Sequence, residues 1–171
     1  MSPAIIAALV GVSFIACVTD IRSRRIPNVL TFGAALAAIV YHTASGGVTG
    51  FQSASLGWLA GAAVFMPFFL LGGMGAGDVK LLAALGAWMG PMGAVWVAVY
   101  ASLAGGAMAI FVALGSGYLR TALVNVWNLL LFWTLVGPRP MPALTLERGQ
   151  GPRLAYAVPI FVGTVVTLWI R

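Results

Sequence analysis

The chain has 171 residues, of which 61% are apolar and only 7% carry charge, and its mean hydropathy is +1.04. A soluble domain carries about 25% charged residues, so this composition excludes a soluble globular protein and indicates a chain embedded in lipid. Apolar runs of roughly 20 residues recur along the whole length. We therefore expect one membrane-embedded domain over residues 1–171, with an all-α fold of about six transmembrane helices plus an interfacial helix.

The nine Lys and Arg residues outnumber three acids, which gives a net charge of +6. The cations lie at the ends of apolar runs and form no dense stripe, so they indicate membrane orientation and lipid contact, with no nucleic-acid partner. Cys17 is the only cysteine, which excludes an intrachain disulfide and a cysteine-only zinc site. No basic residue precedes the first apolar run, so we expect that run to be a retained span and not a cleaved signal.

In chain order, the first span is expected over 3–19, followed by a basic turn over 20–28 and a second span over 29–43. An uncharged loop around Ser45–Gly47 leads to a third span over 51–71 and then to a glycine loop over 72–77. Residues 79–115 are too long for one span, and the break is expected at Gly90–Gly93. The remaining spans are therefore expected over 79–89, 94–114 and 154–170.

The segment 118–136 is ambiguous between crossing the membrane and lying along its surface. Thr121, Asn125 and Asn128 share one helical face, which is typical of an interfacial helix. If it lies flat, eight of the nine cations face the cytoplasm: Arg22, Arg24, Arg25, Lys80, Arg120, Arg139, Arg148 and Arg153. The tendency of cationic loops to stay inside favours this arrangement, with six spans and both termini outside.

Two of the three acids, Asp20 and Asp78, are then expected at one depth near the cytoplasmic face. Asp78 could simply cap the helix that follows it. Asp20 ends a helix, where the helix dipole disfavours an anion, although Arg22 or Arg24 could offset that charge. Ionisable residues beside membrane spans are costly, so both are candidates for function.

Two carboxylates in one site share a proton and can hydrolyse a peptide bond without a metal or another cofactor. The ionised member takes a proton from water, and the protonated member polarises the carbonyl. Gly73, Gly75 and Gly77 precede Asp78, and we expect them to allow unusual φ angles and close approach of an extended substrate. The small-residue pairs Gly57–Gly61 and Gly86–Gly90 are instead expected to pack helices together.

Three segments carry a family resemblance: Gly75–Leu81 (GAGDVKL), Asp20–Asn28 (DIRSRRIPN) and Tyr156–Ile160 (YAVPI). The first resembles the signature of the GxGD membrane aspartyl proteases, in the form typical of type IV prepilin peptidases. The second resembles the other aspartate motif of that family, and the third resembles its last span.

The resemblance implies that Asp20 and Asp78 are the catalytic pair of an aspartic endopeptidase. Such an enzyme cleaves leader peptides from prepilins at the cytoplasmic face of the bacterial inner membrane, and pilus assembly machinery is a possible partner. Arg22, Arg24, Arg25 and Lys80 match family positions too, where they could contact substrate or anionic lipid.

Longer family members carry a cytoplasmic insertion with paired CxxC motifs, which is linked to N-methylation. Here eight residues separate Asp20 from the second span and no CxxC occurs, so the chain resembles the short form of tight-adherence (Flp) pilus systems, without methyltransferase activity.

Three alternatives remain open at this level. A small transporter could use the two aspartates as a proton relay, although a relay favours polar groups at the membrane midplane. A non-catalytic assembly subunit would tolerate Asn at either position. A related GxGD protease could act on a different leader or signal peptide.

Overall fold

A computed structural model describes residues 1–141, 144 and 154–170. Within them the chain forms six helices: α1 (Pro3–Ser23), α2 (Asn28–Leu70), α3 (Ala76–Met89), α4 (Pro91–Gly115), α5 (Leu119–Val136) and α6 (Ala157–Ile170). The predicted all-helical membrane fold is confirmed, and α1, α2, α4 and α5 are each long and apolar enough to cross a membrane.

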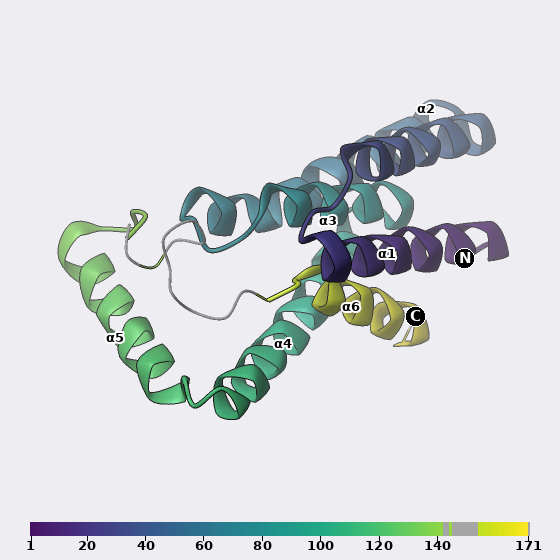
Figure 1. The fold of residues 1–171 in the computed structure, drawn as a ribbon. Coiled ribbons are helices and arrows are strands. Elements are labelled where there is room, and N and C mark those ends of the chain that lie inside the picture. Colours follow the sequence, from purple (N-terminus) through teal and green to yellow (C-terminus); the bar gives the residue numbers. More distant parts are fainter. Residues whose placement is uncertain (142–143, 145–153, 171) are drawn as a thin grey trace.

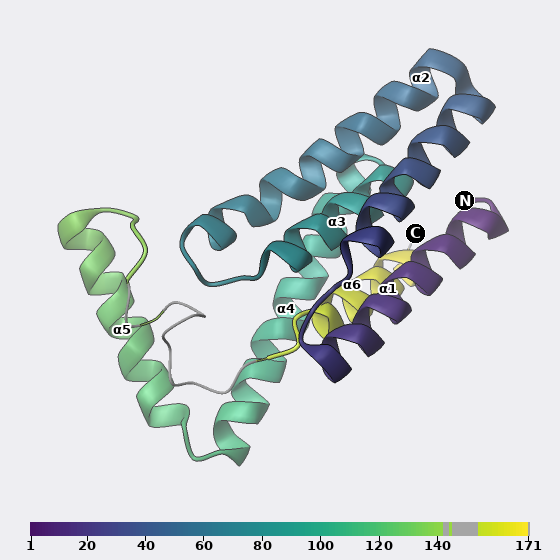
Figure 2. The ribbon, with the colours of Figure 1, turned by 45° about the horizontal axis from the view of Figure 1, so that its top comes forward.

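Helix α2 is a hairpin made of the two spans expected over 29–43 and 51–71. Its arms meet at Gly47, whose φ of 58° lies in the left-handed region that glycine adopts without a steric penalty. The loop predicted around Ser45–Gly47 therefore lies at the turn. Figure 2 shows the two arms running side by side, with α3 lying along them.

Helix α3 is the centre of the bundle. Every residue from Asp78 to Trp88 is buried, with the single exception of Lys80. A Cβ on Gly57 would collide with the backbone oxygen of Gly86, and one on Gly61 would collide with that of Leu82. The predicted packing role of Gly57, Gly61 and Gly86 is confirmed, because their missing side chains let the two backbones touch.

Helix α4 begins at Pro91 after Gly90, whose φ is 78°, so the break predicted at Gly90–Gly93 is present. Helix α4 crosses the bundle and packs against α6 and α2, while α1 packs mainly on α6 (Figure 1). The N-terminus and the end of α6 lie at the same end of the bundle (Figure 1), as the expected topology requires.

Four predicted boundaries are wrong by about one turn. Helix α3 begins at Ala76 and α4 at Pro91, before the expected 79 and 94, so Asp78 lies inside the first turn of α3 and not before it. Helix α1 continues to Ser23, so Asp20 lies inside its last turn and not after it. Helix α6 begins at Ala157 and not at 154, so Pro159 falls in its first turn, where proline is tolerated because the first N–H groups of a helix have no partner within the helix.

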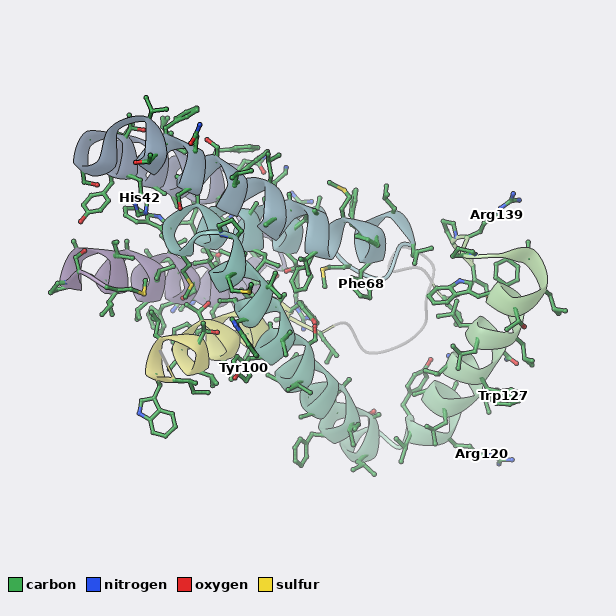
Figure 3. The ribbon with its side chains drawn as sticks, turned by 180° about the vertical axis from the view of Figure 1, so that it is seen from behind. His42, Phe68, Tyr100, Arg120, Trp127 and Arg139 are labelled. Atoms are coloured by element: carbon green, nitrogen blue, oxygen red, sulfur yellow. The ribbon has the colours of Figure 1, made fainter. Side chains whose placement is uncertain are left out.

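Helix α5 stands apart from the bundle (Figure 1), and among the described helices its main contact is with α4. Within the described part of the chain, none of its residues is buried. Arg120, Trp127 and Arg139 lie on the side of this region that faces away from the bundle (Figure 3). The amide of Asn125 donates to the hydroxyl of Tyr118 at 3.1 Å, so the predicted polar face is partly satisfied within the helix.

The interfacial orientation of 118–136 stays a prediction, because α5 is also long and apolar enough to span. Of the cations behind that prediction, Arg148 and Arg153 lie outside the described residues.

Candidate active site

Asp20 is held near the end of α1 by contacts from both directions along the chain. Its backbone carbonyl accepts from the N–H of Arg24 at 2.9 Å, where the chain leaves the helix in a left-handed conformation. Its side chain, only 9% exposed, accepts from the N–H of Ala157 at 3.3 Å. Since Ala157 begins α6, the carboxylate lies at the positive end of a helix 137 positions away in sequence.

Asp78 lies in the first turn of α3 and is equally buried, at 9% exposure. The N–H of Gly75 donates to its carboxylate at 3.2 Å, and its own N–H donates to the Gly75 carbonyl at 3.2 Å. Asp78 thus takes part in capping the helix, but from its third position, and Gly75 is the cap residue. The Oδ2 oxygen of the Asp78 carboxylate accepts the Gly75 N–H, and the other carboxylate oxygen takes no part in that hydrogen bond.

The two carboxylates lie within electrostatic range of each other, although 58 positions separate them in sequence. Tyr156, which precedes α6, lies within range of Asp78 as well and hydrogen bonds to Ser102. Its ring packs edge-on against Phe65 at 5.9 Å and covers Gly105, where a Cβ would lie 2.8 Å from the ring. The site therefore draws on α1, α3, α4 and the start of α6.

The segment before Asp78 differs from the predicted glycine loop over 72–77 in two respects. Helix α3 begins at Ala76, so Gly77 lies in the helix, and the unusual φ angles expected of Gly73, Gly75 and Gly77 are absent. Among the glycines of this loop only Gly72 has a positive φ, at 77°, and Gly75 has ordinary extended backbone. What Gly75 and Gly77 provide is close approach. A Cβ on Gly75 would lie 3.1 Å from the Asp78 carboxylate, and one on Gly77 would lie 3.2 Å from Ile26.

The two aspartate motifs also touch each other away from the carboxylates. Besides the contact of Ile26 with Gly77, the Lys80 ammonium donates to the side-chain oxygen of Asn28 at 3.0 Å and lies 5.5 Å from the centre of the Phe32 ring. These contacts bring the Ile26–Asn28 end of the first motif onto the start of α3.

The basic residues separate into two groups. Arg22, Arg24 and Arg25 are exposed on the surface at the end of α1, whereas Lys80 is partly buried against α2. The arginines remain candidates for substrate or lipid contact. For Lys80 the pairing with Asn28 is an additional role that the sequence did not predict.

A model of the type IV leader peptidase family matches residues 7–110, which is more than half of the chain and includes both aspartates. The chain belongs to the type IV leader peptidase family. No curated protein and no solved structure matches it. Membership indicates a protease, and hence a hydrolase, of the leader-peptidase kind in a multi-pass membrane protein.

Three residues that contribute to the site were not predicted from sequence. Ala157 acts through its backbone N–H, which leaves no residue-type signal. Ile26 and Asn28 belong to the Asp20–Asn28 motif, but the motif by itself predicts no contact for either side chain. The available signal for Ala157 was Pro159, because a proline just inside an apolar run favours the start of a helix there.

Proposed function

We propose that this protein is an aspartic endopeptidase that cleaves leader peptides from prepilins at the cytoplasmic face of the bacterial inner membrane. The observation that carries the proposal is the pair Asp20 and Asp78, both buried, on different helices, and within electrostatic range of each other. Family membership supports the leader-peptidase class, and prepilins are the substrates that the family implies.

In the proposed mechanism the two carboxylates share one proton, because two adjacent anions in a buried site repel each other. Each carboxylate accepts one backbone N–H at the start of a helix, so the shared proton belongs to the pair, and the proposal assigns the ionised state to Asp20. It takes a proton from the attacking water. Asp78, in its protonated state, donates to the oxygen of the scissile carbonyl and stabilises the negative charge that develops there.

No metal or other cofactor takes part in this proposal. The single cysteine leaves no paired CxxC motif, so we propose no N-methyltransferase activity and place the enzyme with the short form found in tight-adherence (Flp) systems. The glycine loop from Gly72 to Gly77 lies directly before Asp78, and we propose that an extended substrate lies against it. Pilus assembly machinery is a proposed partner.

The test mixes the purified protein with a prepilin that carries its leader and measures cleavage as a shift of the prepilin band on a gel. Asp20→Asn and Asp78→Asn should each reduce cleavage by at least about 10³-fold, and the double variant should be no worse than either single one, because the two residues act as a unit. Both proteins should elute and melt like the wild type. Substantial cleavage by either single variant would exclude the pair as the catalytic centre.

A further inference from the structure

A cavity lies on the other side of α3 from Asp78. It has a volume of about 260 Å³. We call it the α2–α3 groove, and its lining residues come only from the two arms of α2 and from α3: Phe32, Trp58, Ala62, Met66, Phe69, Ala76, Val79, Lys80 and Ala83. Apart from the Lys80 ammonium, these side chains are apolar.

Helical geometry separates this groove from the catalytic pair. Ala76, Val79, Lys80 and Ala83 follow the spacing of one helical face. Asp78 is two positions from both Ala76 and Lys80, which places it about 160° around the helix from each. A peptide lying in the α2–α3 groove would therefore be on the wrong side of α3 to reach the carboxylates.

The groove also opens to the membrane. Among the described residues, none from α1, α4, α5 or α6 lines it, and Phe32, Met66 and Phe69 are 50%, 39% and 39% exposed. A groove lined by apolar side chains and facing lipid suits an acyl chain. The lipid tail gains contacts there that a smooth helix surface would not offer.

Lys80 supplies the charge that selects among lipids. One of its three N–H donors is used by Asn28, and the ammonium is held over Phe32, so donors remain for a further acceptor at a fixed position. Lys80 lies two residues from Asp78, near the membrane boundary at the aspartate end of the bundle. A cation at this depth complements a phosphate headgroup of the anionic inner leaflet.

We propose that the α2–α3 groove binds one anionic phospholipid, with an acyl chain among the apolar residues and the phosphate on Lys80. Phe69, near the end of α2, and Ala76, the first residue of α3, both line the groove, one on each side of the loop from Leu71 to Gly75. The bound acyl chain would contact both ends of that loop, on the side of α3 opposite the catalytic pair. The proposal does not depend on the proposed peptidase function, because lipid retention is measured whether or not the protein cleaves a peptide.

The experiment uses the full-length protein reconstituted in vesicles of equal phosphatidylglycerol and phosphatidylcholine, released in mild detergent, and weighed by native mass spectrometry. The wild type should retain phosphatidylglycerol about fivefold over phosphatidylcholine, which corresponds to about 1 kcal/mol for one cation near an anionic surface. Lys80→Gln should abolish that preference, and Lys80→Arg should keep it.

A matched pair of variants tests the groove itself. Ala62 lines it, whereas its neighbour Ala63 is exposed outside it, so Ala62→Trp should fill the groove and lose the lipid while Ala63→Trp retains it. Melting temperatures show whether both variants fold. A photoreactive benzoylphenylalanine at Met66 tests the groove whether or not Ala62→Trp folds, and it should crosslink phosphatidylglycerol.

Three results would overturn the proposal. The first is equal retention of the two lipids by the wild type. The second is an unchanged preference in Lys80→Gln. The third is capture of an added prepilin at Met66 in place of lipid, which would assign the groove to the substrate.

Discussion

Helices α3 and α5 are both apolar, but they occupy opposite environments. Helix α3 has 14 residues, fewer than a membrane crossing needs, yet Lys80 is its only residue from Asp78 to Trp88 that is not buried. Helix α5 has 18 residues and is apolar enough to cross, yet within the described chain it buries none of them. Hydropathy therefore predicts which segments leave water, whereas the small residues of a helix determine whether it packs inside the bundle.

The difference lies in the partners that each helix finds. Helix α3 carries Gly86 and several alanines, and it meets Gly57 and Gly61 on α2 at backbone contact. Helix α5 contains no glycine and carries large side chains such as Trp127 and Leu130, which are 63% and 50% exposed. In lipid, where burying apolar surface gains little, close packing is what brings helices together.

The largest expected effect comes from adding one methyl group to the α3 contact. Gly86→Ala should destabilise the folded protein by about 3 kcal/mol, because the new Cβ collides with the Gly57 backbone. Gly106→Ala in α4 is the control, since nothing lies within 4 Å of its Cβ position. That change should be neutral or stabilising by up to about 1 kcal/mol, from helix propensity.

Thermal unfolding in detergent measures both changes. Equal melting temperatures for Gly86→Ala and Gly106→Ala would show that close backbone contact does not hold α3 in the bundle.

The next effect falls on activity and concerns the loop that leads into α3. Gly75→Val and Gly77→Val should each reduce prepilin cleavage about 10²-fold, because the new side chains displace the Asp78 carboxylate and Ile26. Melting temperatures should change little, since Gly75 and Gly77 lie at the start of α3, outside its buried part.

Gly73→Ala is the matched control for this loop, because its Cβ would meet only the Phe68 carbonyl, at an ordinary 3.6 Å. Gly73→Ala should retain most of the activity. If both valine variants cleave prepilin at the normal rate, the loop is only a linker between α2 and α3.

A smaller effect is expected from the Lys80–Asn28 hydrogen bond, which joins α3 to the start of α2. A double-mutant cycle with Lys80→Gln and Asn28→Ala should give a coupling energy of about 1 kcal/mol in unfolding. Because Lys80→Gln also removes the ammonium group proposed to bind the lipid phosphate, the cycle is measured in uncharged detergent. Additive losses would mean that the two side chains act independently.

The smallest effect is expected in α5. Leu130→Ala should change the free energy of unfolding by less than about 0.5 kcal/mol, whereas Leu82→Ala in α3, fully buried, should cost about 2 kcal/mol or more. A large loss from Leu130→Ala would show that α5 packs against something in the membrane, such as a second copy of the chain.

Whether α5 crosses or lies flat is a separate question that cysteine labelling answers in a Cys17→Ala background. Met141→Cys follows α5 and should be labelled from the periplasmic side only after permeabilisation if α5 lies on the cytoplasmic surface. Val48→Cys, 72% exposed beside the α2 turn, is the control that should label at once. Labelling of Met141→Cys in intact cells would establish that α5 crosses.

Much of this protein could be predicted from its sequence alone. The apolar runs predicted an all-helical membrane protein, and the chain breaks at Gly47 and Gly90 follow from glycine's access to positive φ. The scarcity of acids singled out Asp20 and Asp78, because an ionisable group beside a membrane span is too costly to keep without a use.

Only the tertiary structure decided how the site is completed. The N–H of Ala157 reaches Asp20 across 137 positions, and Lys80 reaches Asn28 across 52. A backbone amide has no residue-type signature. Helix α3 is buried and α5 is exposed because of the helices that each one contacts. These features arise from contacts between distant segments, which local periodicity and hydropathy do not encode.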